Sequence, residues 1–97
     1  MSQIEFIWDE QKAETNIAKH GVSFEEAKTA FYDPNARVTY DPDHSQDEDR
    51  YILLGISESL RILVVCHLYR EDEETIRLIS ARKATKPERK QYQGFTQ

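Results

Sequence analysis

Apolar and polar residues follow two different periods at the start of the chain. Ile4, Phe6 and Trp8 alternate with Gln3 and Glu5, and this period of two predicts a short strand. The next apolar residues, Ala13 and Ile17, are four positions apart, which places them on one face of a helix. The chain therefore begins with a strand that is followed by an amphipathic helix.

Capping residues mark the ends of two consecutive helices. Asp9 can cap the first helix, and Gly21 is placed to end it in the left-handed conformation. Ser23 and Glu26 have the spacing of a capping box, which predicts the start of a second helix. This helix should stop before Asp33-Pro34, because the residue before proline avoids helical geometry.

Strands dominate the rest of the chain. The short links between the last three strands predict antiparallel hairpins. Thr85 and Glu88 form a second capping box, so a final helix should run to about Tyr92. The resulting order, β-α-α-β-β-β-β-α, predicts one α+β domain over residues 1–97, with an antiparallel sheet packed against helices. The predicted strands are rich in β-branched and aromatic residues: Ala36–Tyr40, Tyr51–Ile56, Leu60–Tyr69 and Thr75–Ala81.

Charge is distributed unevenly along the chain. The 97 residues carry a net charge of −5, and residues 1–60 alone carry −8. By contrast, residues 75–90 contain six Lys or Arg and one acid, a local charge of +5. A basic segment in an acidic protein indicates a site for an anionic partner, with phosphate the first candidate, although many such segments only solvate a helix end.

Several His and Arg residues suit RNA cleavage without a metal ion. That reaction needs a base for the ribose 2′-OH, an acid for the 5′-oxygen and cations for the charged phosphate. Taken singly, each residue also has a purely structural explanation, such as a surface ion pair. We expect His44 to act as an acid and His67, in an apolar strand, to be mainly positional. The candidate proton carriers are His44, Glu48 and His67; the candidate phosphate clamps are Arg50, Arg70, Arg77 and Arg82; the candidate RNA-binding residues are Lys83, Lys86, Arg89 and Lys90.

Metal and thiol chemistry find weaker support. The acidic connection after Asp41 resembles the opening of a calcium loop, but Gln46 stands where the turn needs Gly and Ile52 where the bidentate Glu belongs. No pair of His residues has a recognisable zinc-ligand spacing, so no metal and no cofactor are expected. Cys66 is the only cysteine and lies in an apolar run, which predicts a buried structural thiol.

Many of these residues form a pattern that resembles one family along nearly the whole chain. The pattern resembles that of the BrnT toxins of bacterial type II toxin–antitoxin modules. The matching residues are Trp8-Asp9, Lys12, Asn16 and Lys19–Ala27, then Asp43-His44-Ser45, Glu48, Arg50, Gly55, His67 and Tyr69-Arg70, and finally Arg77, Ile79–Arg82, Ala84, Glu88-Arg89 and Tyr92.

The resemblance implies a RelE-like fold and a small ribonuclease that inhibits translation. It also implies a BrnA-like antitoxin with a ribbon-helix-helix region, with promoter DNA bound only through an oligomeric toxin–antitoxin complex. Since no apolar run approaches a membrane span and no signal peptide is visible, we expect a cytoplasmic protein without membrane contact. The alternative is a non-catalytic module that binds the ribbon-helix-helix regulator and assists promoter repression.

Overall fold

The computed structural model describes residues 4–95, which form three helices and a five-stranded sheet in the predicted order. The strands match the prediction closely, except that the fourth begins two residues late and the fifth ends two residues late. Within residues 4–95, no helix combines the length and the apolar character needed to cross a membrane. The elements are β1 (Glu5–Ile7), α1 (Glu10–His20), α2 (Phe24–Thr29), a 3-10 turn (Ala30–Tyr32), β2 (Arg37–Tyr40), a second 3-10 turn (Pro42–His44), β3 (Tyr51–Ile56), β4 (Ile62–Tyr69), β5 (Thr75–Lys83) and α3 (Lys86–Phe95).

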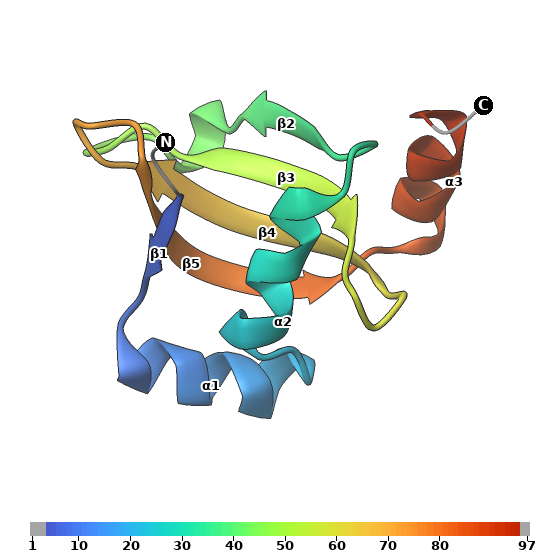
Figure 1. Ribbon diagram of the computed structural model, residues 1–97, viewed down its shortest axis with the longest axis horizontal. Helices are drawn as coiled ribbons and strands as arrows, with labels where there is room; N and C mark the ends of the chain where they lie inside the picture. Colours follow the sequence, from blue (N-terminus) through green and yellow to red (C-terminus); the bar gives the residue numbers. More distant parts are fainter. Residues whose placement is uncertain (1–3, 96–97) are drawn as a thin grey trace.

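The strands lie in the order β1-β5-β4-β3-β2. The pairs β2–β3, β3–β4 and β4–β5 are antiparallel, as the short links predict, whereas β1 pairs with β5 in parallel. The sheet is therefore mixed and not purely antiparallel. Figure 1 shows α2 in front of the sheet and α1 below it, with α3 at the end where β5 finishes.

The helix-packed face of the sheet is the face that carries Leu53, Val65 and Ala81. Here α1 and α2 bury an apolar core, in which Phe24 is 1% exposed and Ala27 is fully buried. Burial of this apolar surface contributes most of the driving force for folding.

Asn16 joins the first helix to the sheet. Its amide nitrogen donates to the carbonyls of Val22 and Ala81, at 2.8 Å each, and its oxygen accepts from the Ala81 N–H at 3.0 Å. These bonds fix the backbone of β5 directly beside Arg82.

The helix caps are largely those predicted. Asp9 accepts from the N–H groups of Gln11 and Lys12, and Gly21 ends α1 with φ of 67°. The predicted capping box of α2 is only half formed: Ser23 accepts from the Glu26 N–H at 3.0 Å, but the Glu26 carboxylate does not reach back. It pairs instead with the Arg61 guanidinium, a charged donor that binds a carboxylate more strongly than an amide does.

The open face of the sheet is the face that carries Ile52, Val64 and Arg82. Of the helices in residues 4–95, α3 covers this face, and it does so at one end through the buried side chain of Tyr92. The Tyr92 hydroxyl donates to Asp33 at 2.6 Å, and burial together with this carboxylate raises the pKa of Tyr92 to about 12. The helix extends three residues beyond the predicted end, to Phe95.

Candidate active site

A cavity of about 220 Å³ lies on the open face, beside the part that α3 covers. Three strands supply its floor, because Ile52 pairs with Cys66, Cys66 with Ser80, and Val64 with Arg82 across the sheet. The polar connection between β2 and β3 supplies one wall. The lining residues are Asp41, His44, Arg50, Ile52, Val64, Cys66, Ile79, Ser80 and Arg82.

His44 is held in place by the buried carboxylate of Asp41. The distance from His44 Nδ1 to Asp41 Oδ2 is 2.8 Å, and Asp41 is only 8% exposed. Because a carboxylate is acceptor-only when ionised, Nδ1 carries the proton in this contact and Nε2 is left for other partners. The carboxylate that orients His44 is therefore Asp41, and not one of the acids that follow His44 in the sequence.

Hydrogen bonds within the connection around His44 hold its two ends together. Ser45 Oγ donates to the Asp41 carbonyl and accepts from the Arg50 N–H at 2.9 Å. The Asp41 N–H donates to the Arg50 carbonyl at 2.9 Å, next to the first residue pair of the β2–β3 ladder. This bonding brings His44 and Arg50 to the same wall of the cavity, although they are six positions apart.

Arg82 is already paired in the free protein. Its two terminal nitrogens donate to the two oxygens of Glu88 at 2.8 and 2.9 Å, and this pairing raises the pKa of Arg82. The same contact, together with the N–H of Thr85, lowers the pKa of Glu88 to about 2. The capping box of α3 thus also orients Arg82, and the arginine expected to clamp phosphate has only part of its donor set available.

Arg50 and Cys66 complete the polar part of the cavity. Within residues 4–95 the Arg50 guanidinium makes no hydrogen bond or ion pair, so it is available to an anion. Cys66 is half-buried at the cavity floor, and burial raises the pKa of its thiol. The sequence predicted a buried thiol, but Cys66 is only half-buried, because no helix of the described residues covers this part of the open face.

His67 lies on the other side of the sheet. It is fully buried, and burial lowers the pKa of its imidazole. Its Nδ1 contacts the Val65 carbonyl at 3.1 Å and its Nε2 contacts the Tyr69 hydroxyl at 3.3 Å, while Phe31 packs edge-on against the ring. His67 therefore lies in the helix-packed core, away from the cavity that His44 lines.

Arg70 and Arg77 also lie outside the cavity. Arg77 sits in β5 between Ile7 and Leu68, and Arg70 borders a separate hollow with Tyr51 and Tyr69. The structure thus brings His44, Arg50 and Arg82 together and separates them from His67, Arg70 and Arg77.

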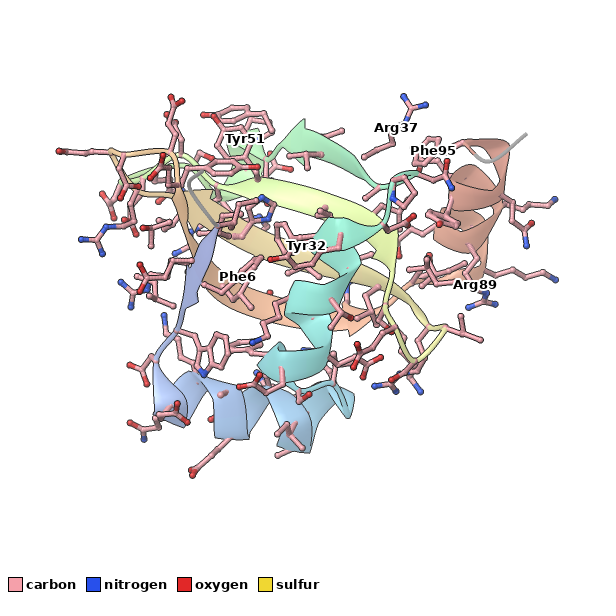
Figure 2. All side chains as sticks on the ribbon, in the orientation of Figure 1. Phe6, Tyr32, Arg37, Tyr51, Arg89 and Phe95 are labelled. Carbon is pink, nitrogen blue, oxygen red and sulfur yellow. The ribbon has the colours of Figure 1, made fainter. Side chains whose placement is uncertain are left out.

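The predicted RNA-binding residues lie on and before α3. Lys83, Lys86, Arg89 and Lys90 are all exposed. Arg89 donates to the Ala84 carbonyl at 2.9 Å, and its side chain extends outward from α3 in Figure 2. These residues surround the first turn of the helix whose Glu88 holds Arg82.

Sequence reasoning missed Asp41 as the partner of His44 and Glu88 as the partner of Arg82. A signal existed for the first pair, since Asp41-Pro42 begins a 3-10 turn in which residues three apart come into contact. Among residues 4–95, no three His, Cys, Asp or Glu side chains are arranged to hold a metal ion.

Comparison with known proteins relates this chain to one protein family. The model of the family described as "Ribonuclease toxin, BrnT, of type II toxin-antitoxin system" matches residues 8–88. The fold is similar to the crystal structure of the Brucella abortus ribonuclease toxin BrnT, with 30% sequence identity and a TM-score of 0.65 over 87% of this chain and 100% of that chain. No curated protein matches the chain. Since the family match spans most of the sequence, the chain belongs to the BrnT family of ribonuclease toxins of type II toxin–antitoxin systems.

Proposed function

We propose that this BrnT-family protein is a metal-independent endoribonuclease that inhibits translation, with its active site in the open-face cavity. The observation that carries the proposal is the convergence of His44, Arg50 and Arg82 on one cavity. An imidazole that can exchange a proton and two guanidinium groups are the parts that RNA cleavage by the ribose 2′-OH requires.

The charges in the cavity suggest how these residues divide the work. Arg50, which has no side-chain partner within residues 4–95, and the remaining donors of Arg82 stabilise the phosphorane as negative charge accumulates. His44, oriented by Asp41, acts in its doubly protonated form: Nδ1–H stays bonded to Asp41, and Nε2–H passes its proton to the 5′-oxygen as the bond between that oxygen and phosphorus breaks. Arg70 and Arg77, which lie outside the cavity, act at most on more distant phosphates.

Glu48 is the candidate for the base. It lines a hollow that adjoins the cavity and that also includes His44 and Arg50. A carboxylate there can accept the 2′-OH proton while Arg50 neutralises the charge of the phosphate beside it. The phosphate backbone on either side of the cut would lie along Lys83, Lys86, Arg89 and Lys90.

The partner is expected to be a BrnA-like antitoxin with a ribbon-helix-helix region. Family membership implies an antitoxin, and the acidic first part of the chain offers a surface for a basic partner. Induction of the chain alone in bacteria should arrest growth, and co-production of its antitoxin should restore growth. Normal growth at verified expression would contradict the toxin assignment for this copy.

Cleavage of purified RNA in the presence of EDTA tests the chemistry. Retained cleavage supports the metal-independent mechanism, and loss of cleavage would favour a metal-dependent one. If Arg50→Ala removes RNA cleavage and leaves antitoxin binding unchanged, the residues that cleave RNA are distinct from those that bind the antitoxin. If neither the wild-type chain nor any variant cleaves RNA while antitoxin binding persists, the alternative of a non-catalytic interaction module is supported.

A further inference from the structure

A second cavity, of about 210 Å³, lies on the open face between β2 and α3. It shares the lining residues Ile52 and Val64 with the candidate active site, so the two cavities adjoin along the sheet. Glu88, which holds Arg82, lines the second cavity as well. A molecule bound at the active site can therefore extend into this cavity without leaving the open face.

The register of the strands sets a cation at each end of this region. Arg37 pairs with Leu54, Leu54 with Val64, and Val64 with Arg82, which forms one row across four strands. Three strand spacings separate the two arginines, roughly 14 Å between their Cα atoms. Between them lie Leu54 and Val64, each 8% exposed, which form an apolar floor.

The last helix forms the opposite wall. Glu88, Gln91 and Phe95 lie at helical spacings of three and four, so α3 presents them on one side, and all three line the cavity. The Arg37 guanidinium lies over the Phe95 ring, 4.8 Å from its centre, and Figure 2 shows the two side chains next to each other beside α3. The wall thus combines a flat aromatic ring, a flat cation and an exposed amide.

We propose that this second cavity is a subsite for a nucleobase of the RNA, the base adjacent to the scissile phosphate. This inference rests on the ribonuclease function proposed above and adds the place where the substrate is recognised. Unstacked RNA bases bind proteins by stacking on aromatic rings and on Arg planes, and polar side chains then read their edges. Phe95 and Arg37 supply the stacking surface, and Gln91 with Thr39 supplies donors and acceptors for the base edge.

The charge of Glu88 does not oppose an RNA in this position. Its two oxygens accept from the Arg82 guanidinium, so the carboxylate is compensated where the two cavities meet. The base enters over the apolar floor and its phosphate stays beside Arg82 and Arg50. A nucleobase subsite next to a phosphate site is therefore consistent with both the shape and the charge of the open face.

The test uses four tetranucleotides that differ in one central base and carry 2′-O-methyl groups, which prevent cleavage. Calorimetric titration compares the wild-type chain with Gln91→Ala, Phe95→Leu and the control Tyr32→Ala. Tyr32 is 65% exposed and lies on the 3-10 turn that packs on the other face. The two subsite variants should weaken binding at least about fivefold for the preferred base, and the control should stay within about twofold of wild type.

A second assay reads the nucleotides at the cut ends of a random-sequence RNA. The subsite variants should reduce the preference for one base on one side of the cut and leave the preference on the other side unchanged. Gln91 is exposed, so its variant decides the question even if thermal melts show that Phe95→Leu has not folded. Wild-type binding and wild-type preference in Gln91→Ala and in folded Phe95→Leu would overturn the subsite.

The two proposals fail in different ways. If the variants lose tetranucleotide binding while no protein cleaves RNA, the second cavity binds a base, but the ribonuclease proposal falls and the base is not next to a scissile phosphate. If the wild-type chain cleaves RNA and the variants bind and select like wild type, the subsite falls and the ribonuclease proposal stands. If the wild-type chain neither binds the tetranucleotides nor cleaves RNA, both are wrong.

Discussion

The helix-packed face and the open face of the sheet each have a histidine, and the surroundings of the two histidines differ. On the helix-packed face, His67 is fully buried, and both of its ring nitrogens have partners in the protein. On the open face, His44 contacts only one carboxylate through Nδ1, and its ring is exposed. A histidine with both nitrogens occupied stabilises a fold, whereas one with a free nitrogen in a cavity can exchange a proton with a substrate.

The arginines show the same contrast. Arg61, near the helix-packed side, donates to Glu26 and to the Gly21 carbonyl and so ties α2 to the β3–β4 turn. Arg82 also holds a glutamate, but it does so at the edge of a cavity that contains Arg50 and His44. The two arginines therefore differ in the open space beside them and not in having an ion pair, and the proposed catalytic role of Arg82 rests on that space.

The largest effect that separates the faces is expected from Arg82→Ala. It should lower the RNA cleavage rate about a hundredfold or more, because loss of one preorganised donor to the transition state costs ~3 kcal/mol. The matched control is Arg70→Ala, outside the cavity, which should cleave at close to the wild-type rate. Cleavage rates are measured at saturating RNA, with thermal melts of both variants. A comparable loss of rate in both variants would show that the cavity arginine is not special.

Adding one methyl group at a glycine should have opposite effects in two regions. A Cβ on Gly55, which faces the 3-10 turn, would lie 3.0 Å from the Ala30 carbonyl oxygen and 3.0 Å from Ala36 Cβ. Gly55→Ala should therefore destabilise the fold by about 1–3 kcal/mol. A Cβ on Gly94 in α3 would meet nothing within 4 Å, so Gly94→Ala should stabilise by up to about 1 kcal/mol. Urea unfolding of both variants measures the change in the free energy of unfolding. A change in the same direction in both variants would contradict this description of the packing.

Acid should loosen the link between α3 and Arg82. The Arg82 guanidinium and the Thr85 hydrogen bonds lower the pKa of Glu88 to about 2, from an ordinary value of 4.5. Because the folded-state pKa is depressed, the stability from this contact is complete above pH 4.5 and is lost as the pH falls toward 2. Glu88→Gln should thus lose less stability than wild type over this window. Parallel curves of unfolding free energy against pH for the two proteins would show that the contact does not contribute.

The smallest expected change lies in the turn between β3 and β4, away from both faces. Leu60 is 79% exposed and has φ of 64°, a left-handed conformation that costs a leucine roughly 1 kcal/mol. Leu60→Gly should raise stability by about this amount and leave RNA cleavage unchanged. A lower melting temperature for Leu60→Gly would mean that the leucine side chain makes contacts that outweigh the strain.

Local signals were sufficient for the elements of the fold. Asp9, Gly21 and the Thr85–Glu88 capping box are bonded as their spacing predicts, since caps depend on residues close in sequence. The partner of Glu26 was not predictable in this way, because Arg61 approaches it from a distant turn. The parallel pairing of β1 with β5 likewise depends on tertiary packing and not on any local pattern.

The site was harder to predict than the fold, because its residues come from a strand with a register shift and from an irregular connection. Between β4 and β5 the register shifts, so that Cys66 faces Ser80 but His67 faces Leu78. Simple alternation along β5 therefore fails to place Arg77 relative to Arg82. His44 comes from a polar connection without any period, and its position depends on the bonds within that connection and on its contact with Asp41.

The claim that catalysis belongs to the open face is tested most directly by two matched substitutions of histidine. His44→Gln and His67→Gln are compared for RNA cleavage per folded molecule and for melting temperature. We expect His44→Gln to lose about a hundredfold or more of the rate with little change in melting temperature. His67→Gln should melt at a lower temperature and cleave, once folded, at close to the wild-type rate. A His44→Gln protein with the wild-type rate, or a folded His67→Gln protein without activity, would contradict the account.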